Sequence, residues 1–262
     1  MFWESNIYEG GGGGGGGSGG NSGGDYDNST PGGSGGNGGS PTIQNPVHID
    51  FEPEDLPAID VSKYLKCFGN IADAGATCTI KILTDIPVDT DPTIFFSTDN
   101  GSPGHTFLQI TKTNGNQSVQ QNIGFYPAEG WKVLTTLPSD GKFVDNASHE
   151  YNGSLSMNLT PDKFQKTLDH IQVLANVIKY DIANSNCTDF ALDVFNYQRG
   201  ANQLNIPKYS IPGDSVPDGS NTPQGLYIKL KALKEEATNP ESQNVTIPGV
   251  KGFAGDSNGP CK

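Results

Sequence analysis

Cys187 stands where a thiol can act as a nucleophile. It follows a polar run and opens a stretch whose apolar residues recur at helical spacing as far as Phe195. Asn186 or Ser185 can cap such a helix, and Asp189 suits its first turn. The cysteine is therefore expected on the first turn. There the positive end of the helix dipole would favour thiolate over thiol, and unpaired amides would hold an oxyanion.

His105 is the candidate base for this thiol. It is the one histidine set in a strand pattern, Gly104-His105-Thr106-Phe107-Leu108-Gln109-Ile110. An imidazole beside a thiol is the pairing that nucleophilic attack on a carbonyl requires. The sequence predicts that Cys187 and His105 lie side by side in the folded chain, within hydrogen-bond reach or slightly beyond it.

A third polar residue should orient the imidazole, and its identity depends on the turn between two strands. Asn114-Gly115 is a strong hairpin signal between the His105 strand and the next one. A three-residue loop would place Gln121 on the face of His105, and Gln121 is the first choice. A two-residue turn would place Gln120 and Asn122 there instead. Outside candidates from the following segment are Asp145, His149 and Glu150.

The patterns around these residues mix strands and helices. Strands are predicted from Thr77 to Ile86, from His105 across the hairpin to Tyr126, and from Tyr151 to Leu159. Helices are predicted over Val61 to Phe68, from Pro161 to Lys179, from Cys187 onward and from Pro223 onward. This order predicts an α+β fold, with an antiparallel sheet packed against helices and the histidine strand preceding the cysteine helix.

Composition divides the chain into three parts. Eighteen of the first forty residues are glycine. This segment has too little apolar surface to offset the entropy of ordering it, so residues 1–40 are expected to form a disordered tail. Residues 41–60 are rich in proline and acidic, and are predicted to be a linker or an arm. Residues 61–262 are expected to form one domain.

Charge and hydropathy exclude two classes of partner. The formal net charge is −13, and no lysine or arginine cluster is present to replace counterions on phosphates, which disfavours nucleic acid. No apolar run approaches the roughly 18 residues of a membrane span. The abundance of Asn, Thr, Ser and Gly favours a secreted, cell-surface or periplasmic protein, although no signal peptide is recognisable at the start of this sequence.

The four cysteines show no close pair of the zinc-site or thioredoxin type, so neither a metal nor a cofactor is predicted. With Cys187 as nucleophile, one disulfide can form among Cys67, Cys78 and Cys261. The pairing of Cys67 with Cys261 is favoured because it closes the longest loop, and Cys78 falls on the apolar face of its strand. The other two pairings stay open.

Two motifs resemble the circularly permuted branch of the papain-like superfamily, which includes the NlpC-like cell-wall peptidases and lecithin retinol acyltransferase. The motif GHTF at Gly104–Phe107 matches the strand of the base, and NCTDFA at Asn186–Ala191 matches the nucleophile helix. Together with GFYP at Gly124–Pro127, the order is similar to an uncharacterised bacterial group of this branch. The resemblance covers roughly residues 60 to 262 and implies a thiol hydrolase with Cys187 as nucleophile and His105 as base, and Gln121 stays the first choice for the third catalytic residue.

Three functions follow from these expectations. The first is a cysteine-dependent hydrolase of amide or ester bonds, such as a peptidoglycan-directed peptidase or amidase. The second is an acyltransferase or thioesterase that uses the same groups on a lipid substrate. The third is a non-catalytic exported binding module, in which Cys187 is a buried core residue.

Overall fold

The computed structural model describes residues 56–95, 102–129, 137–210 and 216–258, all within one compact unit. The predicted tail, 1–40, and most of the predicted linker, 41–60, lie outside the described residues. The end of that linker is part of the domain, because Ala58 bridges to Val144 and the N–H of Ile59 donates to the carbonyl of Phe143 at 2.9 Å. Residues 58 and 59 therefore belong to the domain, although the predicted domain boundary is at 61.

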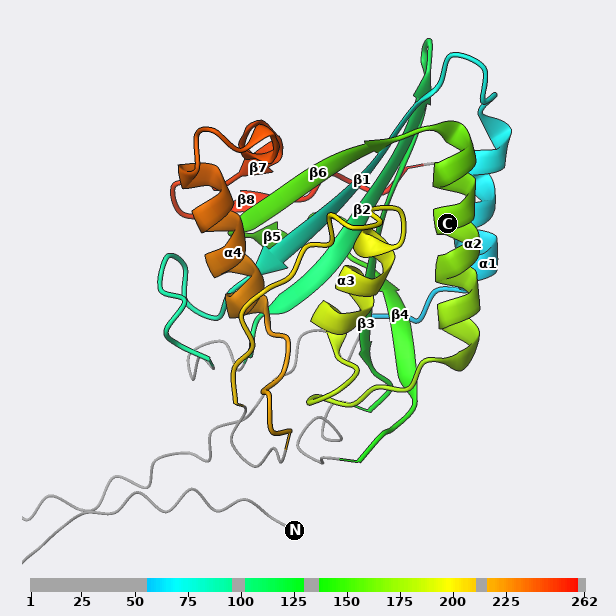
Figure 1. Cartoon of the computed structure of the whole chain (residues 1–262). Coiled ribbons are helices and arrows are strands. Elements are labelled where there is room, and N and C mark those ends of the chain that lie inside the picture. Colours follow the sequence, from blue (N-terminus) through cyan, green and yellow to red (C-terminus); the bar gives the residue numbers. More distant parts are fainter. Residues whose placement is uncertain (1–55, 96–101, 130–136, 211–215, 259–262) are drawn as a thin grey trace, which may run out of the picture. The chain divides into compact units, whose positions relative to one another are not determined.

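The domain is α+β, as predicted, and its centre is an antiparallel sheet of six strands (Figure 1). Their order across the sheet is β4-β3-β2-β1-β6-β7. The strands span Thr77–Asp85 (β1), His105–Asn114 (β2), Gln117–Pro127 (β3), Gly141–Asp145 (β4), Gly153–Leu159 (β6) and Val245–Thr246 (β7). The strand that begins at His105, β2, lies in the middle of the sheet between the long strands β1 and β3.

Four helices and smaller elements surround this sheet. The helices are α1 (Val61–Leu65), α2 (Pro161–Val177), α3 (Cys187–Asn196) and α4 (Pro223–Glu235). The smaller elements are the 3₁₀ helices η1 (Lys66–Asn70) and η3 (Pro240–Asn244) and a two-stranded ribbon of β5 (Glu150–Tyr151) and β8 (Gly252–Phe253). Each predicted helix is present, although α2 ends two residues early and the first predicted helix continues as a 3₁₀ turn.

The β2–β3 hairpin decides which residues share a face of the sheet. Asn114 pairs with Gln117, so Gly115 and Asn116 form a two-residue turn, with Gly115 at a positive φ of 57°. With this register, Gln121 pairs with Ile110 and lies on the face opposite His105. The first choice for the third residue is therefore wrong. The turn places Gln120 and Asn122 on the face of His105 instead.

The helices pack against one face of the sheet and form the main core. Ile80, Ile82 and Leu108 from the strands contact apolar side chains of α2, α3 and α4 in one buried cluster. From α3 this cluster takes Phe190 and Phe195, both fully buried, and each such burial contributes about 1.5 to 3 kcal/mol. A ten-residue helix is marginal in isolation, so this packing is what holds α3 in place.

The opposite face is covered by the β5–β8 ribbon and by the chain that follows it. Leu83, Phe107 and Ala254 form a second, small buried cluster there, with Tyr151 packed against it. The alternation along β2 thus points Thr106 and Leu108 at α3 and points His105 and Phe107 at the other side. Within the described residues, no helix is both long enough and apolar enough to cross a membrane.

Candidate active site

Cys187 is the first residue of α3, as the sequence predicts, and the cap of this helix is complete. Asn186 Oδ1 accepts from the N–H of Thr188 at 2.8 Å and of Asp189 at 3.2 Å, and Asp189 Oδ2 accepts from the N–H of Asn186 at 2.9 Å. Such a cap contributes about 1 kcal/mol. The cap also engages the N–H groups of Thr188 and Asp189, which were expected to be free to bind an oxyanion. Of the first-turn amides, only the N–H of Cys187 remains without a described partner.

The sulfur of Cys187 is enclosed between α3 and the start of β2. Its residue is 8% exposed, Thr188 Oγ1 lies 3.9 Å from Sγ, and the backbone N–H of Thr106 also contacts the sulfur. Thr188 Oγ1 is 3.0 Å from Thr106 Oγ1, which ties the first turn of α3 to β2. Burial raises the pKa of Cys187 to about 11, although both contacts act to lower it. This direction is opposite to that expected for a helix-stabilised thiolate, because desolvation is the largest influence on the pKa of the thiol.

His105 is buried in an aromatic pocket on the other face of the sheet. Its ring stacks on the ring of Tyr126, which lies opposite it on β3, with centroids 4.2 Å apart and planes within 19°. The ring of His149 lies at 5.4 Å and that of Phe107 at 5.9 Å. Burial first, and then His149, hold the pKa of His105 well below its usual value, so the imidazole is neutral near pH 7.

Asn146 is the polar residue that lies beside the imidazole, and the sequence did not select it. A Cβ on Gly124 would stand 2.0 Å from Asn146 Oδ1 and 2.6 Å from His105 Nε2, so both atoms lie in the space beside Gly124 that a side chain would need. Both atoms are buried without a hydrogen-bond partner within the described part of the chain, and the Asn146 side chain acts to raise the pKa of His105. Asn146 Nδ2 donates to Tyr126 Oη at 2.6 Å, which fixes the amide. The sequence signal that could have pointed to Asn146 was its position next to Asp145, one of the predicted candidates.

The imidazole and the sulfur lie on opposite sides of the peptide unit that joins His105 to Thr106. The β2–β3 ladder stops at Phe107 and Gly124, although β2 continues back to His105 and β3 forward to Pro127. The sulfur contacts the N–H that follows His105 at this opening, while the ring projects from the other face. No hydrogen bond joins Sγ to the ring among the described residues, so the predicted direct contact is not present.

The other candidates for the third residue have structural partners. The Nε2 of Gln121 donates to the carbonyl of Tyr64. Gln120, Asn122 and Asp145 each hydrogen-bond the C-terminal segment 255–258, through Asp256, Gly255 and Ser257 respectively. Glu150 forms an ion pair with Lys251. Of the residues that the sequence proposed, only His149 lies beside His105.

Two of the predicted disulfide pairings are excluded. Cys67 is disulfide-bonded, whereas Cys78 and Cys187 are free and buried. Cys78 therefore pairs with neither Cys67 nor Cys261. The favoured partner of Cys67 was Cys261, which lies outside the described residues.

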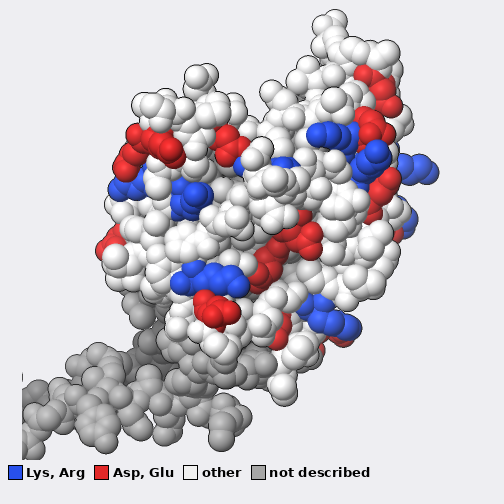
Figure 2. Space-filling view, viewed as in Figure 1, with Lys and Arg blue, Asp and Glu red and all other residues white. Residues whose placement is uncertain are grey.

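The charge on the helical side of the domain is mixed. Figure 2 shows acidic and basic side chains interspersed on this face, with an acidic group near its centre. Among the residues that the structure describes, no group of three or more His, Cys, Asp or Glu side chains is arranged to hold a metal ion. Comparisons with protein-family models, with curated proteins and with solved structures found no match.

Proposed function

We propose that this domain is a cysteine-dependent hydrolase of amide or ester bonds with a permuted papain-like arrangement. Cys187 is the nucleophile, His105 the base, and Asn146 the residue that positions the imidazole. The observation that carries the proposal is Asn146 Oδ1 beside His105 Nε2, next to the peptide that the sulfur contacts. With Nε2 directed at Asn146, Nδ1 is the ring nitrogen that can take a proton, which is the logic of Cys-His-Asn sites.

The two pKa shifts favour general-base catalysis over a preformed ion pair. The raised pKa of Cys187 and the lowered pKa of His105 keep both groups neutral at pH 7. In the proposed reaction Sγ attacks the carbonyl carbon and its proton passes to His105, whose ring lies on the opposite face of the sheet in this structure. The proton then goes to the leaving amine or alcohol. Water hydrolyses the thioester, which releases the acid and restores the thiol.

Replacing the nucleophile tests this proposal directly. We expect Cys187→Ala to reduce hydrolysis of purified peptidoglycan and of p-nitrophenyl acetate by roughly 10³-fold or more, because the covalent step is lost. Cys78→Ala is the matched control, since Cys78 is also free and buried but lies on β1. A Cys187→Ala protein that hydrolyses both substrates as fast as the wild type would remove the proposal.

The identity of the bond that is cleaved and the cellular compartment of the protein are parts of the same proposal. Peptidoglycan peptides are the proposed substrate on the resemblance to NlpC-like peptidases, and lipid acyl transfer is the alternative within the same chemistry. A disulfide at Cys67 supports a secreted, cell-surface or periplasmic location, because disulfides persist in oxidising compartments.

A non-catalytic binding module is the second candidate, and one observation favours it. Cys187 is enclosed and its thiol is held protonated, as for an ordinary core cysteine. This candidate predicts a domain that binds a ligand and retains that binding in Cys187→Ala.

Alkylation of Cys187 provides a test of its environment. Because burial raises the thiol pKa to about 11, the rate with iodoacetamide should climb about tenfold per pH unit from pH 7 to 10 without a plateau. Peptide mapping by mass spectrometry separates Cys187 from Cys78, whose pKa burial also raises. A rate that levels off below pH 8 would contradict the structure and restore the expected helix-stabilised thiolate.

A further inference from the structure

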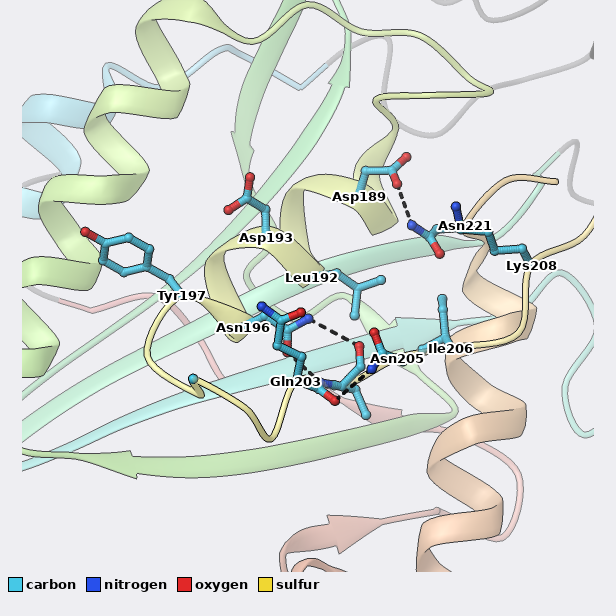
Figure 3. Close-up of a pocket in the computed structure, with 12 residues that line it drawn as sticks. Asp189, Leu192, Asp193, Asn196, Tyr197, Gln203, Asn205, Ile206, Lys208 and Asn221 are labelled. Carbon is cyan, nitrogen blue, oxygen red and sulfur yellow. Dashed lines mark hydrogen bonds between the residues drawn. The ribbon is translucent and has the colours of Figure 1, made fainter. Parts of the chain in front are cut away.

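A groove of about 520 Å³ lies on the outer side of α3, and Cys187 is not among its lining residues. One wall is α3 and the other is the chain from 203 to 208 (Figure 3). Leu192, Leu204 and Ile206 give it an aliphatic floor, and Asn196, Gln203 and Asn205 give it a polar rim. The volume is that of sites for small ligands or short chain segments.

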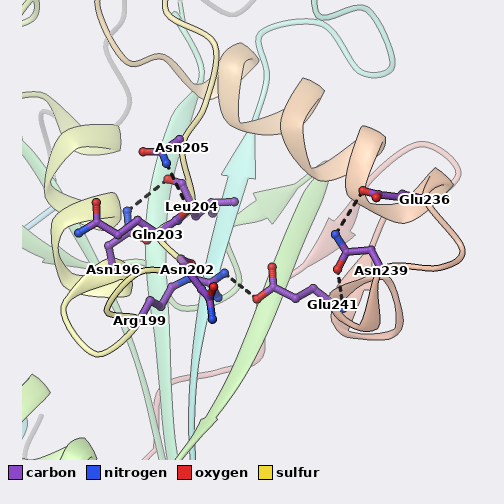
Figure 4. Close-up of polar contacts among 9 residues, drawn as sticks. All are labelled: Asn196, Arg199, Asn202, Gln203, Leu204, Asn205, Glu236, Asn239 and Glu241. Carbon is purple, nitrogen blue, oxygen red and sulfur yellow. Dashed lines mark hydrogen bonds and ion pairs between the residues drawn. The ribbon is translucent and has the colours of Figure 1, made fainter.

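The chain that forms the second wall is held rigidly. Asn196 Oδ1 accepts from the N–H of Leu204 at 2.7 Å, and its Nδ2 donates to the carbonyl of Leu204 at 3.2 Å. Arg199 donates to the carbonyl of Asn202 at 2.7 Å and to Glu241 of η3 at 2.6 Å (Figure 4). The Arg199 side chain is 7% exposed, so this ion pair is largely removed from water. The groove is thus formed before any ligand binds, which lowers the entropic cost of binding.

Several hydrogen-bonding groups along this wall have no partner in the described chain. The side chain of Gln203 and the backbone N–H groups of Asn205 and Ile206 make no hydrogen bond to described residues, and residues 202–208 form no helix or turn. Unpaired backbone groups of this kind are a template for an added peptide strand. The aliphatic floor beneath them suits an apolar side chain.

Charge and aromatic placement decide between ligand classes. Asp189 accepts from Asn221 Nδ2 at 2.7 Å and also interacts with the charge of Lys208, the lysine that lines the groove. Asp193 pairs with His170 at 2.7 Å, so both carboxylates are engaged. Tyr197, the one aromatic side chain among the described residues that line the groove, stacks on His170 at 4.0 Å and points away from the floor (Figure 3). None of these described residues therefore offers an aromatic platform for a sugar ring, and the engaged carboxylates do not call for a cation.

We propose that this groove binds a short, uncharged peptide in extended conformation, with one aliphatic side chain against Leu192 and Ile206. Its main chain hydrogen-bonds the amide of Gln203 and one of the two unpaired N–H groups of Asn205 and Ile206, because successive N–H groups of an extended chain point to opposite sides. The site is independent of the thiol chemistry, and it is an exosite if the domain is a hydrolase.

Titration of ¹⁵N-labelled protein with N-acetyl-Ala-Leu-Ala-amide tests the groove. We expect saturable shifts of the amide signals of Asn205 and Ile206, equally in Cys187→Ala protein. A double variant, Gln203→Ala with Ile206→Asp, should weaken binding at least tenfold, because it removes a hydrogen-bond group and places a charge on the floor. Asn176→Ala, an exposed substitution on α2 away from the groove, should bind as the wild type does.

Three outcomes would overturn the proposal. The first is no shift at these amides up to about 5 mM peptide, with either the Leu peptide or its all-Gly analogue. The second is saturable shifts with chitotetraose in place of the peptide, which would make the groove a sugar site. The third is binding that persists unchanged in the double variant.

Discussion

Gly124→Ala should lower the free energy of unfolding by about 3 kcal/mol, because the added methyl group has no space. Its position is 2.0 Å from Asn146 Oδ1, 2.6 Å from His105 Nε2 and 2.9 Å from the Tyr126 ring. All three side chains are buried and pack against each other, so none can move aside without disturbing another. The backbone of Gly124 is not at positive φ, so the cost is steric.

Urea unfolding followed by circular dichroism measures this change. Gly69→Ala is the matched control, because a Cβ there meets nothing within 4 Å, and we expect its effect to stay within about 0.5 kcal/mol. The Gly124 variant should also lose any hydrolytic activity, since the methyl group displaces the imidazole from Asn146. Equal stabilities for the two variants would show that the imidazole and Asn146 are not packed over Gly124.

Acidification from pH 7.5 to 5.5 should destabilise the domain, with His105 as the largest single contributor. Its pKa in the folded state is well below the value of 6.5 for an exposed histidine. Below pH 6.5 the unfolded chain therefore binds a proton that the folded chain refuses, and the free energy of unfolding falls. The limit for one such group is about 1.4 kcal/mol per pH unit. Stability from this group is fully present above pH 6.5.

His105→Gln should flatten that pH dependence. Urea midpoints at four pH values in this window provide the measurement. Burial raises the pKa of Asp189, so protonation of this carboxyl on acidification increases the free energy of unfolding. This opposite effect acts only at the lower pH where the carboxyl takes up a proton. An unchanged slope in His105→Gln would mean that the imidazole is protonated freely in the folded protein.

The sequence determined the elements and the local chemistry of α3. Helix positions followed from apolar spacing and, for α3, from the cap at Asn186. The structure also has caps at Thr160 and Thr222, and each cap depends only on residues within one turn. The strands of Cys78 and His105 and the hairpin at Gly115 followed from alternation and turn chemistry in the same way. These are local signals, and each can be read from fewer than a dozen residues.

Only the tertiary structure decided what surrounds each functional candidate. The register of the hairpin moved Gln121 away from His105, and the packing of the loop after β4 brought in Asn146. Burial between α3 and β2 raised the pKa of Cys187, whereas the helix end alone would have lowered it. Register, desolvation and contacts between distant segments depend on atoms far apart in the chain. The sequence therefore determined which residues begin α3 and β2, and the fold decided their protonation and their partners.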